Sequence, residues 1–137
     1  MQQRVLVADD DPDVRDLVRQ VLGDDLDVRV DEARDGYEAI LWIRDARPDA
    51  LVLDVRMPRV DGRGVLHWLK SSPSTAAIPV LLLTALEPAG ALQGVERGAD
   101  RVLRKPFELA ELVGAVGALL ARGGRGQPVS PGAPTPA

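Results

Sequence analysis

The chain has 137 residues, a formal net charge of -4 and a pI near 5.0, and 45% of its residues are hydrophobic. This length fits one domain of ordinary size, and the acidic balance argues against direct nucleic-acid binding, which needs clustered positive charge. Cysteine is absent, which excludes disulfides and thiolate metal sites. The apolar stretches near 78–86 and 109–121 are too short for a membrane span or carry Glu111. With no signal-peptide pattern, we expect a cytoplasmic protein without membrane contact.

Short apolar runs alternate along the chain with segments of helical periodicity, which is typical of β-α-β units around a parallel sheet. We expect strands at 5–8, 27–31, 51–53, 80–83 and 102–103. Helices are expected from Pro12 to about Gly23 and at about 36–46, 63–71, 88–97 and 108–121, with a loop at 72–75. Asp11 and Pro12 suit the N-cap and first position of the first helix.

The inward faces of the first and last helices follow from the spacing of their apolar residues. The first helix is expected to bury Val14, Leu17, Val18, Val21 and Leu22, and the last Leu109, Leu112, Val113, Val116 and Leu120. His67, the only histidine, is expected at an exposed helical position, because Leu66 and Leu69 suit the buried face better.

The composition of the strands predicts their order in the sheet. The third strand is wholly apolar, as a central parallel strand is, whereas the alternating second strand and the short fifth strand suit the two edges. Right-handed crossovers then favour the order 2-1-3-4-5 in an α/β three-layer sandwich. We expect one domain over residues 1–121, followed by a disordered Gly- and Pro-rich tail or linker at 122–137.

Polar residues stand at the ends of four of these strands: Asp9 and Asp10, then Asp54, Thr84 and Lys105. The carboxyl ends of parallel strands form one rim, where ligands bind in open α/β sheets. Carboxylates drawn together there repel each other, and Mg2+ is a hard cation that relieves this repulsion. One carboxylate could then attack a phosphoryl group to form an aspartyl phosphate, with a hydroxyl and an ammonium as further donors.

Five motifs fix the family to which the chain is similar. They are Val7-Ala8-Asp9-Asp10-Asp11-Pro12, Leu53-Asp54-Val55-Arg56-Met57-Pro58 with Asp61-Gly62, Leu83-Thr84-Ala85, Gly98-Ala99-Asp100 and Lys105-Pro106-Phe107. Over residues 4–121 the chain resembles the receiver domain of two-component response regulators, which implies a flavodoxin-like fold. The resemblance further implies that a sensor histidine kinase or a phosphotransfer protein phosphorylates Asp54, and that a downstream protein or an output domain reads the result.

The resemblance also implies a role for each residue of the site. Asp10, Asp54 and the backbone carbonyl of Arg56 would ligate Mg2+, and Asp9 would hold it through water. Thr84 would follow the phosphoryl group when the domain switches, and Lys105 would contact a phosphoryl oxygen. The Lys105–Pro106 bond would be cis. Such a protein is a phosphoacceptor in signal transduction rather than an enzyme.

Two other functions stay open at this point. One is an interaction module that works without phosphorylation, although such domains usually lack part of the pocket. The other is a haloacid-dehalogenase-like phosphohydrolase, which also combines Asp, Thr, Lys and Mg2+. That class begins with Asp-x-Asp, whereas Arg56 stands two places after Asp54.

The chain departs from many receivers in two places. Val102 stands where an aromatic residue often changes rotamer with the threonine, so aromatic switching is not expected. Some receivers dimerise through a charged face formed by the fourth helix, the fifth strand and the last helix. The charged pattern of that face is largely missing here, at Arg101 and in the segment 114–117. We therefore expect a monomer or a weak homodimer.

Overall fold

The computed structural model describes residues 2–85 and 98–123. Five parallel strands form one sheet in the order β2-β1-β3-β4-β5. The strands are β1 (Arg4–Ala8), β2 (Arg29–Ala33), β3 (Ala50–Asp54), β4 (Val80–Thr84) and β5 (Arg101–Arg104). The described helices are α1 (Pro12–Leu26), α2 (Gly36–Asp45), α3 (Gly62–Lys70), α4 (Pro73–Ala76) and α5 (Leu109–Gly123). The predicted α/β class and strand order are confirmed.

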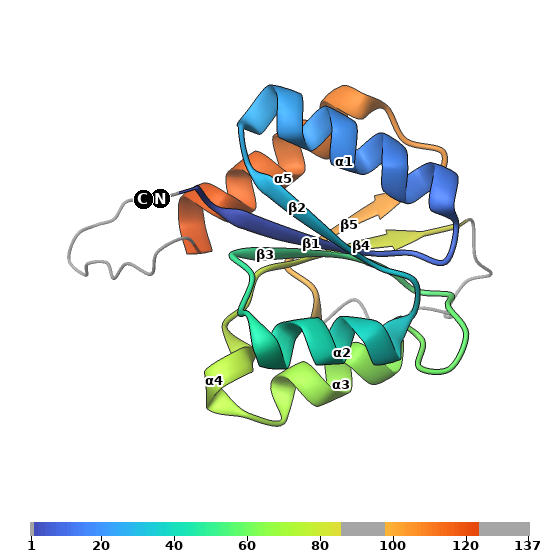
Figure 1. Ribbon diagram of the computed structural model, residues 1–137, viewed down its shortest axis with the longest axis vertical. Coiled ribbons are helices and arrows are strands. Elements are labelled where there is room, and N and C mark those ends of the chain that lie inside the picture. The colour runs from blue at the N-terminus through green and yellow to red at the C-terminus, as the bar shows by residue number, and fades with distance from the viewer. Residues whose placement is uncertain (1, 86–97, 124–137) are drawn as a thin grey trace.

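The helices lie in two layers, with α1 and α5 on one face of the sheet and α2, α3 and α4 on the other (Figure 1). Because neighbouring side chains of a strand point to opposite faces, each strand contributes to both cores. In β1, Val5 and Val7 pack toward α1 and α5, whereas Leu6 and Ala8 pack toward α2 and α3. Every residue of β3 and β4 is buried, as expected for central strands.

The boundary between α1 and β2 differs from the prediction. The helix continues past Gly23 to Leu26, and Asp27 ends it in a left-handed conformation with φ 53°. The Asp27 N–H donates to the carbonyl of Gly23. The second strand therefore begins at Arg29 and ends at Ala33, two residues later than predicted.

Three further predictions are corrected. The segment predicted as a loop at 72–75 contains α4, a single helical turn with Pro73 at its first position. Leu17 is 45% exposed and Leu109 is 40% exposed, so neither belongs to the inward face of its helix. Leu17 flanks the buried stripe of α1, which is centred on Val18 and Leu22, and Leu109 is the first residue of α5. The predicted helix at 88–97 lies outside the described residues, as do residues 124–137 of the predicted tail, whereas residues 122 and 123 belong to α5.

Other side-chain predictions are confirmed. His67 is exposed on α3, while Leu66 and Leu69 are buried. Within the described ranges, no helix has the length and apolar character that crossing a membrane requires.

Candidate functional site

The predicted site residues meet at the carboxyl rim of the sheet. Asp9 directly follows β1, Asp54 and Thr84 end β3 and β4, and Lys105 follows β5. The pairing of Ala8 with Leu53 brings the ends of β1 and β3 side by side, at the place where the strand order reverses. Asp9, Asp54 and Thr84 are 0%, 6% and 1% exposed, so this rim buries three residues of types that are mostly exposed in folded proteins.

Three carboxylates form the centre of the site. One oxygen from each of Asp9, Asp10 and Asp54 lies within 4.8 Å of the others. Asp10 is exposed to solvent, whereas the other two are buried. Oxygen donors at this spacing suit a hard divalent cation such as Mg2+, which is commonly held by one or two carboxylates and keeps several waters. The chemistry and the spacing of the donors therefore fit the ion that the resemblance implies.

Lys105 bridges two of these carboxylates. Its Nζ donates to Oδ2 of Asp9 at 3.0 Å and lies 3.5 Å from Oδ2 of Asp54. Its backbone N–H donates to the carbonyl of Thr84 at 2.7 Å, and the Lys105–Pro106 bond is cis, as the resemblance implied. Burial lowers the pKa of Lys105, but the hydrogen bond to Asp9 and the charges of Asp54 and Asp9 more than offset it and raise that pKa. The side chain is therefore a cation at neutral pH.

The Asp54 carboxyl has a raised pKa, about 6, when no metal is bound. Burial is the largest cause, and the charge of Asp9 is the next. The charge of Lys105 and a backbone hydrogen bond from Arg56 oppose the shift, while Asp10 adds to it. One lysine thus does not neutralise the cluster, which favours a further cation among the carboxylates.

The hydroxyl of Thr84 has a partner of its own. It donates to the carbonyl of Ala85, the next residue, at 3.0 Å. To bind a phosphoryl oxygen at Asp54, this hydroxyl would have to leave the Ala85 carbonyl.

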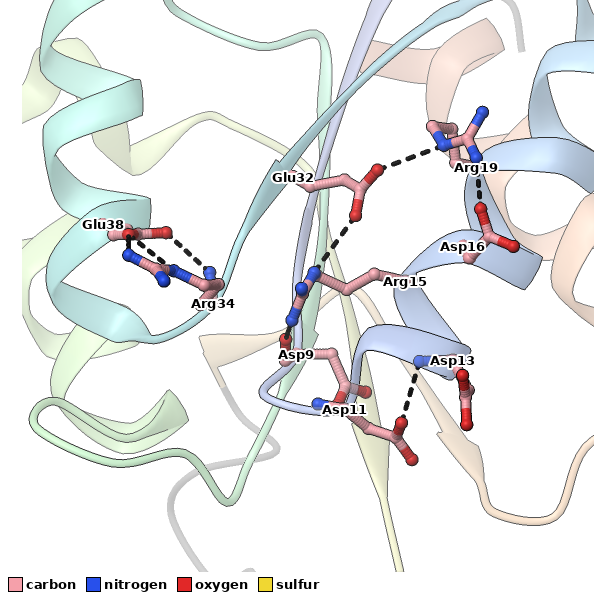
Figure 2. A network of polar contacts seen from close by, with 9 residues as sticks. All are labelled: Asp9, Asp11, Asp13, Arg15, Asp16, Arg19, Glu32, Arg34 and Glu38. Carbon is pink, nitrogen blue, oxygen red and sulfur yellow. Dashed lines mark hydrogen bonds and ion pairs between the residues drawn. The ribbon is translucent and has the colours of Figure 1, made fainter.

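A network on α1 and β2 holds the backbone of the acidic cluster (Figure 2). Arg15 donates to the carbonyl oxygen of Asp9 at 2.8 Å, and its Nε pairs with Glu32 at 3.1 Å. The other carboxylate oxygen of Glu32 pairs with Arg19, also at 3.1 Å. The Asp11 N–H donates to Oδ1 of Asp9 at 2.9 Å, which orients this carboxylate from its other side. Arg15 is not among the residues predicted from the sequence, because its place one turn into α1 gave only a weak signal.

A backbone hydrogen bond joins the two ends of the segment between Asp54 and α3. The Gly62 N–H donates to the carbonyl of Val55 at 2.8 Å. A Cβ at Gly62 would lie 2.6 Å from the carbonyl oxygen of Asp54, so only glycine allows this close approach. Asp61 then caps α3 by accepting from the Gly64 N–H at 3.1 Å. The sequence indicated a turn at Asp61-Gly62, but not its contact with the backbone of Asp54.

The strand order and the acidic cluster at its reversal point define a doubly wound α/β protein, a class whose members bind ligands at the switch point. The model of the response regulator receiver domain matches residues 5–117. The chain belongs to this family, whose members are signalling domains of two-component systems that bind Mg2+ at an aspartate cluster and work with a histidine kinase.

The relatives agree with this assignment. The chain is 45% identical over 123 residues to the response regulator MprA of Mycobacterium ulcerans (strain Agy99). This alignment covers 89% of this chain and 52% of the relative. The chain thus spans about half the length of the curated relatives it matches. The signal receiver domain of a signal transduction histidine kinase from Syntrophus aciditrophicus superposes with a TM-score of 0.83 at 30% identity, covering 95% of this chain and 98% of that one. A putative response regulator from Chloroflexus aurantiacus superposes with a TM-score of 0.81 at 37% identity. The match covers 89% of this chain and 100% of that one.

Proposed function

We propose that the protein accepts a phosphoryl group on Asp54 from a histidine kinase or a phosphotransfer protein, in a Mg2+-dependent reaction. The observation that carries this proposal is the position of Asp54. Its carboxylate is buried, lies within 4.8 Å of the carboxylates of Asp9 and Asp10, and has the Lys105 ammonium 3.5 Å away. A nucleophile, a cation site and a donor for phosphoryl oxygens thus share one rim.

Each residue has a distinct part in the proposed reaction. Asp10, Asp54 and the Arg56 carbonyl would ligate Mg2+, and Asp9 would hold it through water. The ion would supply positive charge that balances the carboxylates and the incoming phosphoryl oxygens. An oxygen of Asp54 forms the new bond to phosphorus while the bond from phosphorus to the donor group breaks, and the Lys105 ammonium donates a hydrogen bond to a phosphoryl oxygen.

We propose that Thr84 couples this reaction to a change of conformation. Its hydroxyl leaves the Ala85 carbonyl, its acceptor at 3.0 Å, for an oxygen of the new phosphoryl group. The added charge thereby biases the backbone that follows β4, as a phosphoryl group does at a two-state element. A downstream protein or an output domain would read this change in the cytoplasm, with the protein acting as a monomer or a weak homodimer.

Intact-mass analysis after incubation with acetyl phosphate tests the proposed function. We expect one phosphoryl adduct that requires Mg2+ and is absent from an Asp54→Asn protein. An Asp45→Asn protein is the matched control, because Asp45 is an exposed carboxylate at the end of α2, away from the rim. If the folded protein binds Mg2+ but forms no adduct, the interaction module that works without phosphorylation becomes the better explanation.

Lys105 gives a second test, because metal binding and phosphoryl transfer should respond to its loss in opposite directions. A Lys105→Met protein lacks the ammonium beside Asp9 and Asp54, so it should bind Mg2+ more tightly, by about fivefold or more given the strength of charge interactions at this range. Its rate of adduct formation at saturating Mg2+ should fall by roughly 100-fold, as on losing one donor to a developing charge. Calorimetry and a mass time course measure the two effects. A fall in both quantities would contradict the proposed role.

A further inference from the structure

A second polar cluster lies next to the site, where the start of α2 meets the segment that follows Asp54. Arg59 Nε donates to Oδ2 of Asp35 at 2.9 Å, and its guanidinium lies over the ring of Tyr37, 4.7 Å from the ring centre. The Asp35 side chain is 9% exposed and that of Arg59 is 55% exposed. We call Asp35, Tyr37 and Arg59 the Asp35–Arg59 clamp.

Arg59 itself has an unfavourable backbone conformation. Its φ is 67°, in the left-handed region that residues with a Cβ seldom adopt. Such a residue persists where its surroundings determine it, and these positions gather at functional sites. Next to it, the backbone of Val60 approaches Gly36 so closely that a Cβ there would lie 2.7 Å from the Val60 carbonyl carbon. The segment is thus held against α2 by side chain and backbone together.

Asp35 is itself fixed in place. It is the N-cap of α2, and its Oδ1 accepts from the Glu38 N–H at 2.8 Å while Oδ2 takes Arg59. Burial alone would raise the pKa of Asp35, but the hydrogen bond from Glu38 and the ion pair with Arg59 hold that pKa below its usual range. The clamp therefore joins Arg59 to a rigid helix end through a carboxylate that stays ionised.

The other end of the segment is the candidate site. Residues 55–61 form a closed loop, because the Gly62 N–H bonds to the Val55 carbonyl and Gly62 packs on the backbone of Asp54. Arg56 lies inside this loop, three residues before Arg59. A loop closed at its base and held at one further point has little freedom to move Arg56 independently of Arg59.

We infer that the Asp35–Arg59 clamp is a positioning device that fixes the 55–61 loop, which carries the Arg56 carbonyl proposed as a Mg2+ ligand, and so sets the affinity for Mg2+. This inference rests on the proposed function. The side chain of Arg59 contacts Asp35 and Tyr37, and it acts on the site through the backbone of Arg56. Residues that orient metal ligands from outside commonly change metal affinity when they are replaced.

Calorimetric titration with Mg2+ tests the inference on four proteins: the parent, Arg59→Ala, Arg59→Gly and Arg34→Ala. The alanine variant should bind Mg2+ about three- to tenfold more weakly, at or below the lower end of the range for residues that support metal ligands. The glycine variant should be weakened to a similar extent, because it accepts the backbone conformation but lacks the guanidinium. Arg34 is the matched control, since it pairs with Glu38 at the same end of α2 (Figure 2) and is 72% exposed.

The acetyl phosphate reaction separates positioning from a general loss of structure. For Arg59→Ala the rate should fall at limiting Mg2+ and return to the parent rate at saturating Mg2+, while its circular dichroism without Mg2+ stays that of the parent, a combination that unfolding would not produce. If Arg59→Ala binds Mg2+ with the affinity of the parent, the proposed role of the clamp is wrong. The same holds if only Arg59→Gly does so, because the backbone conformation and not the side chain would then set the affinity. Absence of Mg2+ binding or of an adduct in the parent protein would instead overturn the proposed function.

Discussion

Replacing Gly36 by alanine is expected to destabilise the protein by about 2 to 4 kcal/mol, at or above the upper end of overpacking costs. Gly36 is buried at the first position of α2. Its added Cβ would lie 2.7 Å from the carbonyl carbon and 2.8 Å from the Cβ of Val60, and closer still to the Val60 oxygen. Backbone atoms cannot rotate away as the end of a side chain can, so α2 and the 55–61 loop must separate. Urea unfolding followed by circular dichroism measures the loss.

The same substitution at Gly114 provides the control. Gly114 lies in the interior of α5, and a Cβ there would meet nothing within 4 Å. Alanine has a higher helix propensity than glycine, so Gly114→Ala should stabilise the protein by about 0.5 to 1 kcal/mol. Opposite signs for the two variants would establish close packing as the cause. A neutral Gly36→Ala would show that the loop can move without cost.

Replacing Asp54 by asparagine should stabilise the metal-free protein by about 2 kcal/mol at pH 7.5. The folded-state pKa is about 6, above the value near 3.9 of an unfolded chain, and each pKa unit corresponds to about 1.4 kcal/mol. The ionised carboxylate is thus a cost to the fold, which is fully present above the folded pKa. Asparagine removes the charge with little change in volume. Urea unfolding in the presence of a chelator measures the difference.

The dependence on pH and Mg2+ makes this prediction specific. As the pH falls from 6 to 4, Asp54 takes up its proton in the folded protein, so the advantage of asparagine should shrink and disappear near pH 4. Adding Mg2+ should also narrow the gap, because the ion stabilises the folded state of the parent protein by binding to it. Asp45→Asn should change stability by less than about 0.5 kcal/mol at every pH. An equal gain at pH 4 and pH 7.5 would exclude charge repulsion as the cause.

The sheet and the site could be predicted because both depend on local patterns that repeat along the chain. Wholly apolar runs identified β3 and β4 as central strands, and the edge patterns of the second and fifth strands completed the order. Once the strands are parallel, residues at their carboxyl ends must converge. The meeting of Asp9, Asp10, Asp54 and Lys105 therefore required no knowledge of side-chain contacts.

The features that escaped prediction depend on contacts between distant parts of the chain. Asp35 and Arg59 are 24 residues apart, and neither has a local pattern that names the other. Gly23 suggested a helix end because glycine favours the left-handed conformation there, yet Asp27 adopts it instead. Leu17 fits a helical stripe in the sequence, but α1 buries only Val18 and Leu22 fully.

The two edge strands determine how copies of the protein can meet. The outer strand β2 carries Arg29, Asp31 and Glu32, and β5 on the opposite edge carries Arg101 and Arg104. If a strand from a second molecule paired with either edge, its side chains would lie against these charged side chains. Charged edges are a common means by which β proteins resist edge-to-edge aggregation. The protein should therefore remain dispersed at high concentration without forming fibrils, even though its two central strands consist of strongly aggregation-prone sequence.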